Sequence, residues 1–365
     1  MIRAAACAVL LFWALPATAT GTEKAATTDT IRIATFHTEL DRNGPGLLLR
    51  DITRGQAPDI DAALATIVLA DADVLLLQGI DHDAETRALT ALRDRLSDAG
   101  LLYPFFFAPP SNRGMIAEID LDGDGRISLP DDGQGYGDFR GQGAMALLSR
   151  FPIMTDSAHD FTAMIWSHLP DARLPVHADG TPFPSRQARA SQRLSTTGHW
   201  IAPIATPAGR LDILAFHATP PVFDGPEDRN GLRNADEISF WQHYLDGRLG
   251  IEPFAGFAIL GVANMDPDLG VGNRAALAAL LSDPRLIDPA PKGAKGRATV
   301  DWDTVTPPRQ RVDYVLPSSS LIVTDAGIVW PSSPDAGRHG LVWADIALPS
   351  IAATAAAMAT SGGVD

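Results

Sequence analysis

The sequence predicts an α/β protein whose strands are buried on both faces, and three observations lead to this prediction. Strand-like segments alternate along the chain with segments whose apolar residues recur at helical spacing. The run DVLLLQ (73–78) is continuously apolar, which is typical of a strand covered on both sides. Polar side chains come directly after the ends of the strand-like segments. The chain of 365 residues, 45% of them hydrophobic, is long enough for a sizeable core.

The elements follow one another in a regular order. The first hundred residues predict a strand, a helix, a strand and a helix, at 31–36, 60–72, 73–78 and 86–100. A long polar insertion at 108–142 leads into the apolar segment GAMALLSRFPI at 143–153. We expect the remaining strands at 211–217, 257–264, 311–317, 321–330 and 341–348, and a helix at 234–247 that Asn234 caps.

Histidines and amides gather at the ends of these strands. His37, Gln78, His217 and Asn264 each come at or just past the end of an apolar strand, and His339 comes just before the last one. Polar groups collected beyond one edge of buried strands favour a binding or catalytic site there.

The two ends of the chain differ in composition from the rest. Residues 1–19 have the features of a secretory signal peptide: a basic start, an apolar run of about a dozen residues and the small residues Ala17-Thr18-Ala19. That run is shorter than the roughly 20 residues needed to span a bilayer, so we expect a secreted or periplasmic protein without stable membrane insertion. The only cysteine, Cys7, lies within it. Residues 20–30 are a predicted linker, and 350–365 a flexible tail.

The formal net charge of −15 makes long nucleic acid an unfavourable partner, because an acidic surface repels phosphates at long range. A small phosphate ester held in a local basic pocket remains compatible with this charge. The sequence does not indicate an oligomeric state.

The insertion contains an acidic loop, DLDGDGRISLPD (120–131). Its spacing matches a calcium loop of the EF-hand type, with Gly125 at the sharp turn and four carboxylates as candidate ligands: Asp120, Asp122, Asp124 and Asp131. Two features depart from the pattern, since Asp131 replaces the usual glutamate and Pro130 precedes it. The alternative is an acidic turn exposed to solvent.

Taken in order, the stretches RIATF-H, DVLLLQ-G, GAMALLSRFPI, LAFHATPP, ILGVANMDP, RVDYVLPS and GRHGLVWADI resemble the endonuclease/exonuclease/phosphatase superfamily. The resemblance covers residues 31–349. It implies a four-layer α/β sandwich, with two packed β-sheets flanked by helices, that hydrolyses phosphate esters with Mg²⁺ or Mn²⁺. Such an ion polarises the phosphoryl oxygen and offsets its negative charge.

The resemblance also implies roles for particular residues. It assigns catalysis to His217, Asn264, Asp313 and His339: His339 activates water or stabilises charge, His217 holds a non-bridging oxygen, and Asn264 orients the substrate. His37 and Arg338 stand where the family has other residues, and we expect them to bind substrate, although His37 could also bind metal. Arg229 and Arg233 are candidate phosphate contacts in the loop after His217, with a solvated connection as the alternative.

Three carboxylates of the family pattern are missing from this chain. Gly79 stands in the place of the metal-binding glutamate, Val262 in that of the aspartate of Asp-x-Asn, and Arg338 in that of the aspartate before the last histidine. Two interpretations stay open. Either the protein is a hydrolase with a rearranged site, in which Asp81 holds the metal, or it is a degenerate member that binds a phosphorylated or anionic ligand.

Overall fold

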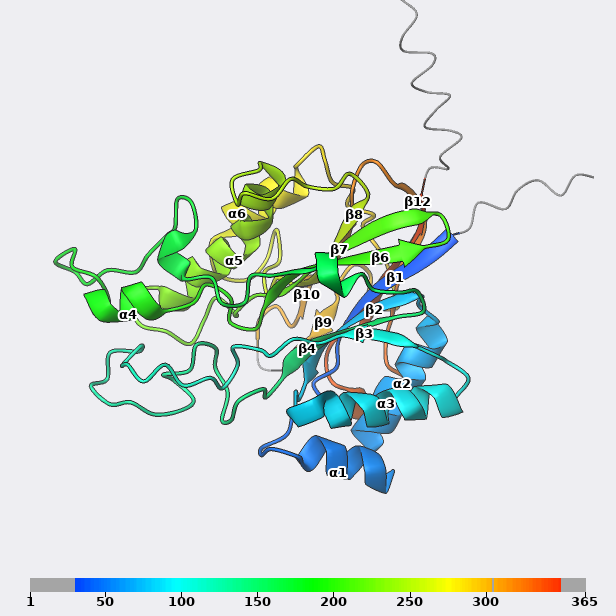
Figure 1. Ribbon diagram of the computed structural model, residues 1–365. Coiled ribbons are helices and arrows are strands. Elements are labelled where there is room, and N and C mark those ends of the chain that lie inside the picture. Colours follow the sequence, from blue (N-terminus) through cyan, green and yellow to red (C-terminus); the bar gives the residue numbers. More distant parts are fainter. Residues whose placement is uncertain (1–29, 304, 349–365) are drawn as a thin grey trace, which may run out of the picture.

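Two mixed β-sheets pack face to face, with helices on their outer sides (Figure 1), in a computed structural model that describes residues 30–303 and 305–348. The predicted signal peptide, nearly all of the linker and the 350–365 tail lie outside these residues. Within the described ranges, no helix combines the length and apolar character that crossing a membrane requires.

The first sheet collects strands from both ends of the chain. Its strands are β1 (Thr30–His37), β2 (Val74–Ile80), β3 (Phe105–Phe107), β4 (Ala144–Ser149), β12 (Ile322–Val329) and β13 (Leu341–Ala347). They lie in the order β12-β13-β1-β2-β4-β3. Since β1 and β2 are parallel and pair His37 with Gln78, both strands end at the same edge of the sheet.

The second sheet comes from the middle of the chain. Its strands are β5 (His159–Asp160), β6 (His199–Thr206), β7 (Gly209–His217), β8 (Phe257–Val262) and β11 (Asp313–Pro317), in the order β11-β8-β7-β6-β5. β7 and β8 are parallel, so His217 lies beside Val262, and Val262 in turn pairs with Asp313 of β11. A separate two-stranded sheet joins β9 (Val300–Asp301) to β10 (Arg309–Gln310).

Helices form the outer layers. The first sheet is covered by α1 (Leu47–Arg54), α2 (Pro58–Ala70) and α3 (Arg87–Asp98), and the second by α5 (Arg229–Leu245) and α6 (Arg274–Leu281). The short elements are α4 (Arg186–Ser191) and the 3₁₀ turns η1 (Ala84–Thr86), η2 (Thr155–Ser157), η3 (Trp166–His168) and η4 (Pro334–Ala336).

Burial on both faces explains the apolar run of β2. Val74 and Leu76 pack between the two sheets, whereas Leu75 and Leu77 pack against the helices. Removing such a side chain from water stabilises the fold by about 1.5–3 kcal/mol, so strands of this kind hold both cores together. The four-layer α/β sandwich expected from the sequence is confirmed.

The predicted cap of the 234–247 helix is wrong. α5 begins five residues earlier, at Arg229, and Asn234 lies fully buried inside it. Its amide donates hydrogen bonds to the carbonyl oxygens of Thr219 (2.6 Å) and Ala263 (2.7 Å). Asn234 therefore ties α5 to the loops that follow β7 and β8, the strands that carry the site.

Candidate functional site

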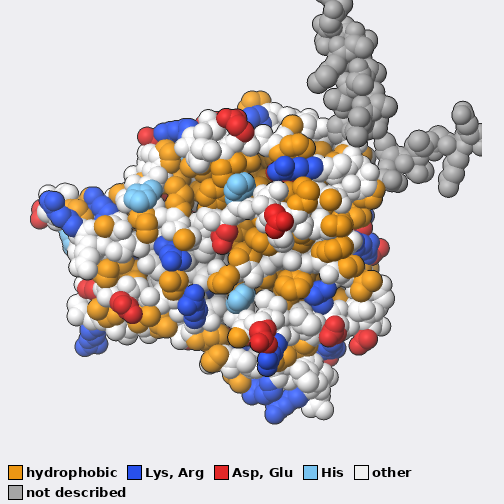
Figure 2. Space-filling view, in the orientation of Figure 1, with side chains coloured by type: hydrophobic (Ala, Val, Ile, Leu, Met, Phe, Trp, Pro, Cys, Tyr) orange, Lys and Arg blue, Asp and Glu red, His pale blue; other side chains and the backbone are white. Residues whose placement is uncertain are grey.

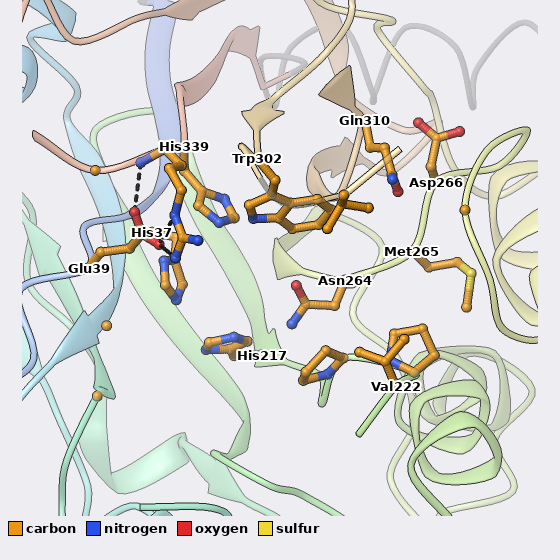
Figure 3. Close-up of a pocket in the computed structure, with 18 of the residues that line it drawn as sticks. His37, Glu39, His217, Val222, Asn264, Met265, Asp266, Trp302, Gln310 and His339 are labelled. Carbon is orange, nitrogen blue, oxygen red and sulfur yellow. Dashed lines mark hydrogen bonds and ion pairs between the residues drawn. The ribbon is translucent and has the colours of Figure 1, made fainter. Parts of the chain in front are cut away.

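A cavity of about 790 Å³ opens at the end of the sandwich where β1, β7 and β8 finish (Figure 3). His37 is the last residue of β1, His217 is the last of β7, and Asn264 follows β8 by two residues. His339 precedes β13 by two residues, and all four side chains line the cavity. Strand ends that are far apart in the sequence thus meet at one place.

Three imidazoles form a cluster in this cavity. The ring centroid of His37 lies 4.5 Å from that of His339 and 5.0 Å from that of His217. Burial, with the neighbouring cationic groups as a lesser cause, lowers the pKa of His37 and of His217 well below the usual range. Both rings are therefore neutral at neutral pH. The buried Nδ1 atoms of His37 and His217 find no hydrogen-bond partner among the described residues.

Asp313 fixes the orientation of His339. Its two carboxylate oxygens lie 3.0 and 3.1 Å from Nδ1 of the histidine. A carboxylate can only accept, so Nδ1 carries the hydrogen and Nε2 is left free. Burial lowers the pKa of His339, but the charge and hydrogen bond of Asp313 outweigh this, and the net shift is upward. Asp313 is fully buried and does not line the cavity, so it is a positioning residue.

Glu39, which no sequence pattern indicated, completes a group of side chains that could hold a metal ion. One ligand atom each from His37, Glu39 and His339 lies within 4.8 Å of the others. The Glu39 carboxylate also accepts hydrogen bonds from the backbone N–H of Arg338 (2.6 Å) and from its guanidinium (Nε, 2.9 Å). Burial would raise the pKa of Glu39, but these bonds lower it overall. Glu39 comes two residues after the end of β1. The strand-end rule, by which polar residues at the ends of buried strands are taken as site residues, would have found Glu39 if it had included the two residues after each strand.

Gly79 is a glycine because its neighbours leave no room for a side chain. Its φ is +68°, and a Cβ there would lie 2.9 Å from the backbone nitrogen of Glu39 and 3.2 Å from Cε1 of His37. The departures from the family pattern at positions 37 and 79 are therefore physically linked. The His37 imidazole lies next to the place where the Cβ of a glutamate at position 79 would be.

Asp81, the residue predicted to hold the metal, lies outside the ligand group of this cavity. Its carboxylate accepts hydrogen bonds from the backbone N–H groups of Arg42 (3.1 Å) and Gly143 (3.0 Å), and it does not line the cavity. Burial raises its pKa to about 6. Asp81 thus holds two loops together. Val262 is fully buried and brings no polar group to the cavity.

The predicted arginines have different surroundings. Arg338 lines the cavity, but its guanidinium is paired with Glu39. Arg229 and Arg233, the candidate phosphate contacts, do not line this cavity. Arg233 is only 5% exposed and donates through Nε to the carbonyl oxygen of Leu194 (2.8 Å). Both arginines line a second, adjoining cavity.

Arg113 supplies a cation that no sequence pattern indicated. It comes from the 108–142 insertion and lines the cavity that contains His37, His217 and His339, called the histidine cavity below. Its Nε donates to the carbonyl oxygen of Gln142 (2.8 Å), and a Cβ at Gly143 would lie 3.1 Å from that Nε. The guanidinium is therefore held close against the backbone beside the cavity.

The acidic loop brings three of its four predicted ligands together. Ligand atoms of Asp120, Asp122 and Asp124 lie within 4.8 Å of one another. The fourth, Asp131, is outside this group and lines the second cavity. The neighbouring Asp132 instead accepts hydrogen bonds from the loop, from the backbone N–H groups of Leu121 (2.6 Å) and Ser128 (2.8 Å).

Of the two ions expected from the sequence, Mg²⁺ and Mn²⁺, the ligands in the histidine cavity suit Mg²⁺ less well. Mg²⁺ prefers oxygen ligands in near-octahedral geometry. Among the described residues, the group close enough to share one ion in this cavity consists of two imidazoles and one carboxylate. Imidazole-rich sites suit zinc and other first-row transition ions better than magnesium.

A fold of two packed mixed sheets, with histidines and an asparagine at the strand ends, defines an α/β sandwich with its site at the edge of both sheets. The sequence profile of the Endonuclease/Exonuclease/phosphatase family matches residues 47–350, and the chain belongs to that family. Its members are mostly hydrolases that act on phosphate esters, and they commonly depend on a divalent metal. A search of the curated proteins found no significant match.

Solved structures support the fold assignment. An endonuclease/exonuclease/phosphatase from Beutenbergia cavernae superposes with a TM-score of 0.53 at 15% identity, over 87% of this chain and 72% of that one. A family protein from Leptotrichia buccalis gives 0.50 at 16% identity, over 87% and 99% of the two chains. One from Bacteroides thetaiotaomicron gives 0.50 at 14% identity, over 87% and 98%. At such identities the likeness concerns the fold alone.

Proposed function

We propose that the protein hydrolyses small phosphate monoesters or diesters with the help of a divalent transition ion held by His37, Glu39 and His339. The observation that carries the proposal is this ligand group, with Asp313 behind His339, in one cavity with His217 and Asn264. The family to which the chain belongs supports the reaction class.

The ligand group has the composition of a hydrolytic zinc site. Two histidines and one glutamate, with an open position for water or substrate, hold zinc in several hydrolases. A carboxylate hydrogen-bonded to the far nitrogen of a ligating histidine fixes its ring and tautomer, as Asp313 does for His339. An ion bound there would polarise a phosphoryl oxygen and offset its charge.

The remaining side chains position the substrate. The Asn264 amide donates to the carbonyl oxygen of Ala218 (2.8 Å), which fixes the side chain beside the cavity. Arg113 brings a guanidinium suited to anionic oxygens. The neutral ring of His217 lies next to His37, and we assign it a hydrogen bond to a non-bridging phosphoryl oxygen.

Turnover of p-nitrophenyl phosphate and bis-p-nitrophenyl phosphate tests the proposal. The chelated protein is reloaded with Zn²⁺, Mn²⁺ or Mg²⁺, and bound ion is measured beside activity. We expect Zn²⁺ or Mn²⁺ to restore turnover, and His339→Ala and Glu39→Gln to lose both ion and turnover. His159→Ala, which removes an exposed histidine of β5, is the matched control. Full activity with Mg²⁺ in the Glu39→Gln protein would contradict the assignment.

A second candidate function is a binding module for a phosphorylated or anionic ligand. It is favoured by Gly79 and Val262, which bring no carboxylate to the cavity. Thermal stabilisation by inorganic phosphate without turnover under any of these ions would favour the module over the hydrolase.

We also propose that the protein is exported and that the acidic loop binds Ca²⁺ through Asp120, Asp122 and Asp124. The apolar segment within residues 1–19 supports export. The three converging carboxylates support the ion, because they repel one another unless a cation lies between them. The ion would fasten the insertion that carries Arg113.

A further inference from the structure

A second cavity, of about 570 Å³, adjoins the histidine cavity. The two share part of their walls, since both are lined by Arg113, His217, Pro220 and Phe223. The insertion forms one side of the second cavity, and the loop after β7 with the start of α5 forms the other. A molecule held at His217 can therefore extend into this second space without leaving the protein.

The two cavities have opposite charge. Five carboxylates, against Arg113 and Arg338, line the histidine cavity: Glu39, Asp41, Asp59, Asp266 and Asp335. The second cavity is lined by the three arginines Arg113, Arg229 and Arg233, against Asp131 alone. In a chain with a net charge of −15, whose visible face in Figure 2 has basic and acidic side chains interspersed, this is a local concentration of positive charge. The first cavity suits a cation and the second an anion.

These arginines keep free hydrogen-bond donors. The Arg113 guanidinium donates through Nε only, to the carbonyl oxygen of Gln142. The Arg229 guanidinium donates through Nη1 only, to the carbonyl oxygen of Leu121 (2.5 Å). Arg233 uses Nε and Nη2 for backbone carbonyls, which leaves its Nη1. Among the described residues, no salt bridge within 4.0 Å involves any of the three, although the charge of Glu237 acts on Arg233 and those of Asp41 and Asp81 act on Arg113 from farther away.

Guanidinium groups without a direct ion-pair partner at a partly buried site gain stabilisation when an anion binds beside them. Arg233 is 5% exposed, and burial, opposed by the charge of Glu237, lowers its pKa to about 10, so it stays charged at neutral pH. Guanidinium forks match the geometry of phosphate and carboxylate oxygens. The arrangement is that of a site for an anionic group.

Two exposed aromatic side chains stand at the second cavity. Phe223 is 87% exposed and Tyr136 is 63% exposed, and both line it. Phe223 also lines the histidine cavity, so its ring lies where the two spaces meet. If a ligand carried one anionic group in each cavity, the organic part between them could pack against these aromatic rings.

We propose that the second cavity binds a second anionic group of the substrate, so that the protein prefers organic bisphosphates, with one phosphoryl group among the histidines and the other among the arginines. The inference rests on the proposed function for the identity of the first group.

Adenosine 5′-monophosphate and adenosine 3′,5′-bisphosphate form a matched pair of probes that differ by one phosphoryl group. Binding to the zinc-loaded protein is measured by calorimetry and turnover by phosphate release. Because charge-assisted hydrogen bonds are strong, we expect the bisphosphate to bind roughly tenfold or more tightly. Arg229→Met should remove most of this preference with little effect on the monophosphate, and Arg229→Lys should restore part of it. Arg54→Met, which changes an exposed arginine at the end of α1, is the control.

The binding and turnover results separate this inference from the proposed function. A bisphosphate preference that depends on Arg229, without turnover, supports the second site and argues against the hydrolase. Equal binding of the two probes, or a preference that Arg229→Met leaves intact, overturns the inference even if both are hydrolysed. If Arg229→Met lowers the unfolding temperature, Arg229→Lys and the wild-type binding ratio still decide the outcome.

Discussion

Replacing Gly79 with alanine tests whether His37 and Glu39 exclude a side chain at this position. At φ = +68°, alanine adopts a left-handed conformation that costs roughly 1–2 kcal/mol. Its Cβ would also lie 2.9 Å from the backbone nitrogen of Glu39 and 3.2 Å from Cε1 of His37. Forcing extra volume into a packed region typically costs about 1–3 kcal/mol. The free energy of unfolding should therefore fall by about 2–5 kcal/mol, as the sum of these two terms.

Gly55 provides a matched control for the backbone part of this cost. Its φ is +64°, and a Cβ there would meet nothing within 4 Å. Gly55→Ala should thus lose only the conformational part, roughly 1–2 kcal/mol. Urea unfolding followed by tryptophan fluorescence measures both, because Trp166, Trp200 and Trp241 are fully buried. A Gly79→Ala protein no less stable than Gly55→Ala would refute the steric argument. In addition, displacement of His37 should weaken Zn²⁺ binding in Gly79→Ala alone.

Three further predictions concern the site, the fold and the insertion. Asp313→Asn should lower Zn²⁺ affinity about 10–100-fold, as loss of a ligand-orienting carboxylate does, with calorimetry as the measurement; unchanged affinity would show that Asp313 does not orient His339. Burial raises the pKa of Glu237 to about 7. The folded state therefore keeps the Glu237 proton to a higher pH than the unfolded state does, and the free energy of unfolding falls as the pH rises from about 4.5 to about 7. Relative to Glu237→Gln, the wild type should lose about 3 kcal/mol over that interval, measured by urea unfolding at each pH, and parallel pH profiles would contradict this. Calorimetry with Ca²⁺ should show one bound ion in the wild type and none after Asp120→Asn with Asp124→Asn; binding that survives the double change would place the ion elsewhere.

The sequence predicted most of the architecture because apolar periodicity reflects burial directly. The run of β2 is apolar on both sides because one side faces the other sheet and the opposite side faces the helices. β6 was not predicted, and it contains Pro203, which lacks a backbone N–H and argues against a strand inside a sheet. The start of α5 was missed because Asn234, a residue typical of caps, is used for a buried tertiary contact instead.

The strand-end rule found the histidines and Asn264 but not their surroundings. His37, His217 and His339 lie at or next to strand ends, so topology alone brings them together. Asp81 also follows a strand, yet its loop turns the carboxylate toward backbone N–H groups, and no local pattern encodes that turn. Arg113 could not be predicted for a related reason: it reaches the cavity from an irregular insertion.

The pairing of Glu39 with Arg338 has a consequence for how the proposed site would take up an ion. The Glu39 carboxylate is already neutralised by the guanidinium of Arg338. The Arg338 side chain is 52% exposed, so it can rotate away from Glu39 toward the solvent. Uptake of an ion at the proposed site would then be an exchange, in which the guanidinium leaves the Glu39 carboxylate as the ion arrives. The local charge would then change by one unit, that of a divalent ion minus that of the guanidinium, instead of by the full charge of the ion.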